Sequence, residues 1–284
     1  MLSRRAIIAA ASAYTAWGFF ALYWKLVQHY PSLGIICHRV IWACVFYGAV
    51  WFAMERKPGQ AIWPDRRNFL LCVASGIMIS ANWLVFIYSV NSNQLLEGSL
   101  AYFINPLLNI FIGALIFGEK MSLLPKLAFT VAATGCVVMA LRGDHFPWLA
   151  LAMAGTFSIY GALKKVTRMN VFHGNWLETL LVSPIALAGA VYFYRSGIVV
   201  PSAFDWLIFV CGGLITGFPM IWFALGARDL PYSLMGFLQF LSPTLQFIIA
   251  IYLYGEVFTE AHGWGFSFIW AGVGLYVWSL FRKR

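Results

Sequence analysis

The sequence predicts an all-α integral membrane protein with ten transmembrane helices, arranged as two inverted repeats of five helices. Three observations predict this class: an apolar composition, ten apolar runs long enough to span a bilayer, and an internal repeat. Of the 284 residues, 62% are hydrophobic and 10% are charged, whereas about a quarter of the residues of a soluble domain are charged. The mean hydropathy is +0.79. Most of the surface of this chain is therefore expected to face lipid.

The ten apolar runs take up most of the chain. A spanning helix needs about 20 residues, so the connections are short and neighbouring helices must run antiparallel. The first run follows two arginines, as in a signal peptide, but it continues to Trp24, and we expect a retained helix. The predicted spans are residues 6–27, 33–54, 69–90, 98–117, 123–141, 147–163, 175–194, 206–225, 232–254 and 264–281.

The distribution of lysine and arginine predicts the orientation. With the N-terminus inside, 15 of the 19 basic residues fall in inner segments, three fall in outer segments and one lies within a span. Basic residues favour the cytoplasmic side of a membrane, so both termini are expected in the cytoplasm. The net charge of +9 is spread in short clusters between apolar runs. Such clusters indicate contact with lipid headgroups rather than with nucleic acid.

Residue types that carry chemistry are sparse and scattered. The five cysteines lie inside apolar runs without a CxxC spacing, and the five histidines follow no pattern. No Walker loop, nucleophile motif or metal-binding spacing occurs. We therefore expect no metal, no cofactor, no enzymatic activity and no ATP-driven transport.

An internal repeat relates the two halves of the chain. The shift that relates them is 137 residues, and it maps the third and fourth predicted helices onto the eighth and ninth, so the repeat unit is five helices: residues 1–141 and 142–284. Because five crossings is an odd number, the second copy must enter the membrane upside down. Inverted repeats of this kind build two access states around one midplane site in transporters. The aligned residues are 102–109 with 239–246, Gly118-Glu119 with Gly255-Glu256, Gly76 with Gly213, and Phe86 with Phe223.

Two polar helix faces near the centres of their spans predict a binding cavity. Tyr102, Asn105 and Asn109 share one face of the fourth span, and the repeat gives the ninth span the same spacing. In hydrocarbon such side chains are expected to face the bundle interior. The alternative is that these amides only join helices. The matching residues of the ninth span are Gln239, Ser242 and Gln246.

Prolines and aromatic residues complete this predicted cavity. Pro106 and Pro243 are expected to break their helices, because proline leaves the carbonyl four residues earlier without its hydrogen bond. Aromatic rings together with amide groups suit a small amphipathic or aromatic organic solute. Further residues predicted to bind substrate are Tyr14, Trp17, Asn82, Trp83, Tyr160 and Trp222.

Ionisable residues inside the spans predict gates. We expect one ion pair near the outer face, Arg39 with Glu97, and one near the inner face, Glu178 with either Lys164 or Lys165. The alternative is static neutralisation of buried charges. His38 and Glu178 are the titratable candidates for proton coupling. Lys25 joins this gating or coupling set.

These residues resemble the drug/metabolite transporter superfamily and, within it, the EamA-type permeases called RarD. The resemblance runs over essentially the whole chain, with Ala101 and Phe240 as departures from the usual glycine and tyrosine. It implies a ten-helix, inverted five-plus-five carrier in a bacterial inner membrane, whose relatives are associated with chloramphenicol phenotypes and with export of amino acids or other metabolites. The residues that carry the resemblance are Trp17-Gly18, Lys25, His38-Arg39, Trp42, Asn82-Trp83, residues 99–107, Gly118-Glu119, Tyr160-Gly161, Glu178-Thr179, Pro184, Thr216, Pro219, Gln239-Phe240, Pro243-Thr244 and Gly255-Glu256.

The function that the sequence favours is secondary transport. We expect an exporter of small organic metabolites or drugs, such as amino-acid-like or chloramphenicol-like solutes, working by alternating access around the midplane cavity. Exchange of related solutes and proton coupling remain open. A channel and a membrane-embedded enzyme or lipid-handling protein are the alternatives. The expected partners are the solute, the bilayer and a proton or counter-transported solute.

Overall fold

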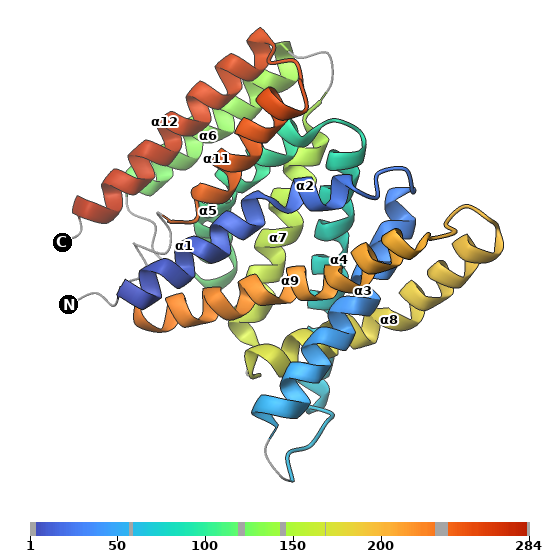
Figure 1. Ribbon diagram of the computed structural model, residues 1–284. Helices are drawn as coiled ribbons and strands as arrows, with labels where there is room; N and C mark the ends of the chain where they lie inside the picture. Colours follow the sequence, from blue (N-terminus) through green and yellow to red (C-terminus); the bar gives the residue numbers. More distant parts are fainter. Residues whose placement is uncertain are drawn as a thin grey trace. The chain divides into compact units, whose positions relative to one another are not determined.

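The computed structural model describes residues 4–56, 59–118, 123–142, 146–167, 169–230 and 238–282, and within them it is built of helices with no strand (Figure 1). The all-helical prediction is therefore confirmed for these residues. The helices are α1 (Arg4–Gly18), α2 (Phe20–Lys25), α3 (Ser32–Val50), η1 (Trp51–Glu55), α4 (Arg66–Asn91), α5 (Leu95–Phe117), α6 (Leu123–Arg142), α7 (Trp148–Val166), α8 (Val171–Arg195), α9 (Ala203–Asp229), α11 (Leu241–Ile248), η2 (Ile249–Leu253) and α12 (Glu260–Arg282).

Six helical segments of the described residues are long and apolar enough to cross a membrane. Helices also lie in the other four predicted ranges: α5, α7, α11 with η2, and α12. Helix α11 and the following η2 together form a shorter apolar helix, Leu241–Leu253. The six segments are Arg4–Lys25, Ser32–Met54, Arg66–Asn91, Leu123–Arg142, Val171–Arg195 and Ala203–Phe223.

The helices group into two compact units, and each unit draws on both halves of the chain. The first unit comprises Met1–Ala21, Ser92–Ser158 and Trp222–Arg284, and the second comprises Leu22–Asn91 and Ile159–Ile221. These units differ from the sequence repeats 1–141 and 142–284, which remain a prediction.

In the first unit, α6 and α12 lie side by side and antiparallel (Figure 1). A Cβ on Gly135 would lie 2.8 Å from the carbonyl oxygen of Gly265, and a Cβ on Gly272 would lie 2.7 Å from that of Ala128. The shift of 137 residues converts one of these contacts into the other. Backbone therefore meets backbone at both crossings, which small residues permit.

Helix α11 packs against both α1 and α5 in the same unit. The rings of Phe103 on α5 and Phe240 before α11 are stacked with centroids 6.2 Å apart, and these two residues are again related by the shift of 137. On the α1 side, a Cβ on Gly18 would lie 2.7 Å from the Cδ1 atom of Leu245. The aromatic residues Phe103 and Phe240 thus mark the crossing of α5 and α11.

In the second unit, α8 packs along α3 and also contacts α4. A Cβ on Gly76 of α4 would lie 2.6 Å from the carbonyl oxygen of Glu178 on α8. A Cβ on Gly213 of α9 would clash with the carbonyl oxygen of Trp42 on α3. Gly76 and Gly213 are aligned by the repeat, and each permits a close helix approach that a side chain would block.

Polar side chains fix several ends of helices in the second unit. Asp65 precedes α4 and accepts hydrogen bonds from the backbone N–H groups of Arg67 (3.1 Å) and Asn68 (3.3 Å). The side-chain hydrogen bond from Asn68 lowers the pKa of Asp65. Asn170 caps α8 by accepting from the backbone N–H of Phe172 at 3.0 Å. Both residues satisfy N–H groups that a helix start leaves unbonded.

Side chains in the connection between α2 and α3 contact Asp205 at the start of α9. The hydroxyl of Tyr30 donates to Asp205 at 2.9 Å, and Asp205 also lies 3.6 Å from the Nε2 atom of His29. Burial and the hydrogen bond to Asp205 raise the pKa of Tyr30 to about 12. Tyr30 therefore stays neutral and holds this connection at ordinary pH.

We predict that Gly135→Ala destabilises the protein by about 1–3 kcal/mol, because the new methyl group overpacks the α6–α12 contact. Gly274→Ala is the matched control on α12, since a Cβ there meets nothing within 4 Å. It should be neutral or stabilising by up to about 1 kcal/mol, because alanine favours helix over glycine. Thermal unfolding of the purified protein measures both changes; equal responses of the two variants would contradict the close contact.

Candidate functional site

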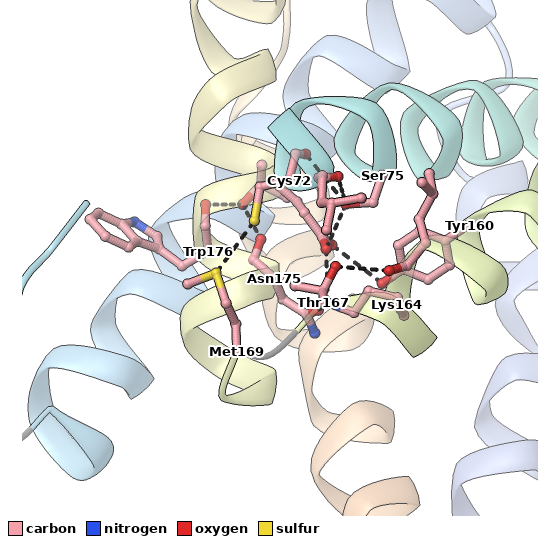
Figure 2. Close-up of polar contacts among 12 residues, drawn as sticks. Cys72, Ser75, Tyr160, Lys164, Thr167, Met169, Asn175 and Trp176 are labelled. Atoms are coloured by element: carbon pink, nitrogen blue, oxygen red, sulfur yellow. Dashed lines mark hydrogen bonds and ion pairs between the residues drawn. The ribbon is translucent and has the colours of Figure 1, made fainter. Parts of the chain in front are cut away.

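A buried carboxylate on α8 lies at the centre of a polar cluster in the second unit. Glu178 is 1% exposed. Its Oε1 atom accepts from the Nζ atom of Lys164 at 2.8 Å and from the hydroxyl of Ser75 at 2.9 Å. Its Oε2 atom accepts from the hydroxyl of Tyr160 at 3.3 Å. The Lys164 ammonium also donates to Oδ1 of Asn175 at 2.9 Å. Figure 2 shows the side chains of Ser75, Tyr160, Lys164 and Asn175 gathered around this cluster.

Helical spacing brings the members of this cluster together. Asn175 and Glu178 are three residues apart on α8, and Tyr160 and Lys164 are four apart on α7. Residues at these spacings lie on one face of a helix. Gly174 leaves room for the lysine, because a Cβ at that position would lie 3.2 Å from Nζ of Lys164.

The charges of Lys164 and Glu178 compensate each other at a buried position. Their side chains are 25% and 2% exposed, respectively. A buried charge without a partner is strongly unfavourable, whereas a paired and hydrogen-bonded charge is tolerated. Of the two pairings predicted for Glu178, with Lys164 or with Lys165, the structure shows the one with Lys164. Lys165 is exposed, and a gating role for any of these residues remains a prediction.

Two members of the cluster were not predicted from the sequence. Asn175 lies three residues before Glu178, and that spacing was an available signal. Ser75 precedes Gly76, whose backbone approach to Glu178 gives Ser75 its partner, but nothing local in the sequence indicates this contact. Tyr160 was predicted to line the substrate cavity, and in the structure its hydroxyl bonds to Glu178.

Two other predicted gating residues of the second unit, Arg39 and His38, contact aromatic rings. Arg39 is 3% exposed, and its guanidinium carbon lies 5.1 Å and 4.4 Å from the ring centroids of Trp24 and Trp83. This geometry is a cation–π contact. The ring of His38 stacks on Phe209 at 4.1 Å.

Two further predicted residues lie in the same unit. Lys25 donates through Nζ to the carbonyl oxygen of Val90 at 3.1 Å. Asn82, predicted to bind substrate together with Trp83, is buried on α4.

The predicted polar faces of α5 and α11 both belong to the first unit. Asn105 is fully buried, and its Oδ1 atom accepts from the hydroxyl of Ser158 on α7 at 2.9 Å. Gln246 is 1% exposed and donates through Nε2 to the carbonyl oxygen of Trp17 at 3.2 Å and to Ser242 at 3.4 Å. Both amides therefore make helix-to-helix contacts in this structure, and a role of these residues in substrate binding remains a prediction.

The remaining predicted substrate-binding residues of this unit vary in burial. Tyr102 contacts Phe157 edge-to-face, with ring centroids 6.4 Å apart, and Tyr14 contacts Trp17 at 5.5 Å. Gln239 is half-buried. Asn109 and Trp222 are exposed.

The two predicted helix-breaking prolines lie in α5 and α11. Pro243 is buried in the first turn of α11, which begins at Leu241 after a turn at residues 239–240. Proline suits a first turn because its missing N–H would have no partner there. Pro106 lies within the range of α5, but its side chain is outside the described part of the structure.

Two carboxylates in the first unit cap helix N-termini. Glu97 in the first turn of α5 is 4% exposed and accepts from the backbone N–H groups of Leu149 (2.9 Å) and Ala150 (3.4 Å) at the start of α7. Glu256 accepts from those of Leu95 (2.8 Å) and Leu96 (2.7 Å) at the start of α5. A carboxylate is favourable at the positive end of a helix dipole. The predicted Arg39–Glu97 pair joins residues of different units and remains a prediction.

The described residues contain no group of three or more His, Cys, Asp or Glu side chains that could hold a metal ion. The polar contacts described above are instead an ion pair, hydrogen bonds of side-chain amides, and helix caps. Ionisable residues buried among apolar helices are rare in membrane proteins and usually mark a functional site.

Comparison with known proteins shows the family of this chain. The model of the EamA-like transporter family matches residues 4–141. YojE of Bacillus subtilis, named an uncharacterized transporter, is 36% identical over 98% of this chain and 95% of its own. The protein RarD of Escherichia coli is 32% identical over 97% of this chain and 94% of its own. This chain belongs to the EamA-like transporter family, as a RarD-type permease of the drug/metabolite transporter superfamily.

Two more distant similarities add detail. The chloramphenicol-sensitive protein RarD of Pseudomonas aeruginosa is 28% identical over 92% of this chain and 91% of its own. A solved structure titled "Crystal structure of protein" superposes with a TM-score of 0.61 at 18% identity, covering 98% of this chain and 99% of the other. This likeness shows a shared fold.

We predict that Glu256→Gln destabilises the protein by about 0.5–2 kcal/mol, because an amide caps the start of α5 less well than a carboxylate. Glu260→Gln is the matched control: the Glu260 side chain is 83% exposed and pairs with Arg142 at 3.4 Å, so its loss should change stability by less than about 0.5 kcal/mol. Chemical or thermal unfolding distinguishes the two. A larger effect at Glu260 would contradict the capping role.

Proposed function

We propose that this chain is a secondary transporter that exports small organic metabolites or drugs by alternating access around a midplane cavity. Membership of the EamA-like family gives the class, a membrane transporter. The observation that carries the mechanism is the antiparallel pairing of helices through residues related by the shift of 137. Amino-acid-like and chloramphenicol-like solutes are the proposed substrates, the second because of the name of the Pseudomonas aeruginosa relative.

The proposed architecture is ten spanning helices in two inverted repeats of five. The α6–α12 pair supports it, because Gly135 meets Gly265 while Gly272 meets Ala128. A two-fold axis that lies across the helices generates antiparallel contacts of this kind, whereas an axis along the helices would make the repeat-related helices parallel. Inverted repeats have their axis in the membrane plane. The stacking of Phe103 on its repeat partner Phe240 supports the same axis.

The proposed substrate cavity uses the polar faces of α5 and α11. Asn105, Ser242 and Gln246 are buried polar residues on helices that pack together within one unit. Buried amides next to aromatic rings suit a solute with both polar and apolar parts. In the proposed cycle these amides exchange their helix-to-helix bonds for bonds to the solute.

The proposed gates lie at opposite faces of the membrane. With both termini in the cytoplasm, the caps made by Glu97 and Glu256 lie near the outer face, and the Lys164–Glu178 pair lies toward the inner face. The caps tie the starts of α5 and α7 together outside. The proposed outer pair Arg39–Glu97 would act in the same region.

We predict that purified protein in liposomes catalyses saturable counterflow of the solute that most raises its melting temperature among amino acids, nucleosides and chloramphenicol. Asn105→Ala should weaken the apparent affinity about 2–10-fold, because one hydrogen bond to the solute is lost. Thr134→Ala on the exposed face of α6 is the control and should leave flux unchanged. Flux that does not saturate would favour a channel over a carrier, and chemical conversion of the solute would favour an enzyme.

We predict that tags at both ends of the chain lie on the cytoplasmic side of a bacterial inner membrane. The excess of basic residues in the inner segments is the physical reason. Protease protection of tags in spheroplasts and in inverted vesicles measures their sides independently. Tags on opposite sides would contradict an even number of spans and, with it, the five-plus-five arrangement.

A further inference from the structure

We propose that Ser75, Tyr160, Asn175 and Glu178 form a binding site for a primary ammonium group, which the chain's own Lys164 occupies in this structure. We further infer that the ammonium group of a transported solute takes the place of the lysine during the cycle. This second step rests on the proposed transport function, whereas the existence of the site does not.

The contacts of the Lys164 ammonium are those of a bound ligand. Its Nζ atom lies 2.8 Å from Oε1 of Glu178 and 2.9 Å from Oδ1 of Asn175. It also lies 5.7 Å from the centroid of the Tyr160 ring. A primary ammonium has three N–H donors and no acceptor. A carboxylate, an amide oxygen and the face of an aromatic ring are the groups that bind such a cation.

The site is held in place by contacts in which the lysine has no part. Ser75 and Tyr160 donate to different oxygens of Glu178, at 2.9 Å and 3.3 Å. Asn175 and Glu178 stand on the same face of α8, and the close approach of Gly76 to Glu178 fixes α4 beside it. Removal of the lysine side chain therefore leaves an oriented carboxylate and amide behind.

The exposure of the two charged side chains gives the direction of access. Glu178 is almost wholly covered at 2%, whereas Lys164 is 25% exposed. The lysine thus extends from a partly open position to the buried carboxylate. Its flexible stem lets the ammonium leave.

Electrostatics favours exchange of the occupant over an empty site. A buried carboxylate without a cation is strongly unfavourable. A solute ammonium that arrives as Lys164 leaves replaces one positive charge by another. A solute that carries no cationic group cannot make this replacement. The site therefore selects amines over solutes without a primary ammonium group, and of the two proposed substrate classes it favours the amino-acid-like one over the chloramphenicol-like one.

Chemical rescue tests the site in detergent, without any transport. Lys164→Met removes the ammonium and should lower the melting temperature. Methylammonium chloride should then restore it in a saturable way, by about 5 °C. Tetramethylammonium chloride at the same concentration should not, because it has no N–H to donate. Lys165→Met is the matched control, since Lys165 is the exposed neighbour, and it should respond to neither salt.

Two further variants decide the outcome. Lys164→Met combined with Glu178→Gln should show no response to methylammonium, because the carboxylate is gone. If Lys164→Met does not fold, Lys164→Gln serves in its place, since its shorter amide leaves the charge of Glu178 without a cation. Equal responses to methylammonium and tetramethylammonium, or a response that survives Glu178→Gln, would overturn the proposal.

The result separates the site from the proposed function. Rescue by methylammonium without measurable flux in liposomes supports the site and rejects transport. Flux without rescue rejects the site and leaves transport standing. If both hold, the transported solute should lose its effect on the melting temperature when its amine is acetylated.

Discussion

A polar group that this chain places among apolar helices needs a partner within the protein or in a water-filled cavity, since lipid offers none. The carboxylate of Glu178 meets this constraint through three donors from two other helices, Ser75 on α4 and both Tyr160 and Lys164 on α7. Those donors reach it only because Gly76 and Gly174 carry no side chain where the helices and the lysine come close. The burial of the Glu178 charge therefore depends on the presence of glycine at these two positions.

The same constraint acts on the ends of the helices. The starts of α5 and α7 are closed by carboxylates that lie far from them in the sequence, Glu256 and Glu97. Glu97 is itself in the first turn of α5, so the segment after η2, the start of α5 and the start of α7 are joined in series. Each of these ends is joined to the next by a hydrogen bond between a carboxylate and a backbone N–H.

Periodicity and residue type were sufficient to predict what depends on local spacing. The helical segments and the polar faces predicted for α5 and α11 followed from counting residues along one helix, and charge balance predicted a partner for Glu178 but left the choice between Lys164 and Lys165 open. Ser75 could not be predicted, because its bond to Glu178 depends on how α4 packs on α8, 103 residues further along the chain. Asn105 and Asn109 share a predicted face, yet one is buried and the other exposed, since periodicity gives the direction of a side chain and not what covers it.

The contact between α6 and α12 and the contact between Lys164 and Glu178 are of different kinds. At two repeat-related crossings of α6 and α12 the backbones lie so close that a side chain at Gly135 or Gly272 would clash with the facing carbonyl oxygen, so this contact is tightly packed. The contact of Lys164 with Glu178 is made by a flexible side chain, and an ammonium of another origin can replace it without leaving a charge uncompensated. A transporter needs both kinds of contact: backbone pairs that carry a motion, and a charged pair whose exchange ties that motion to the presence of a solute.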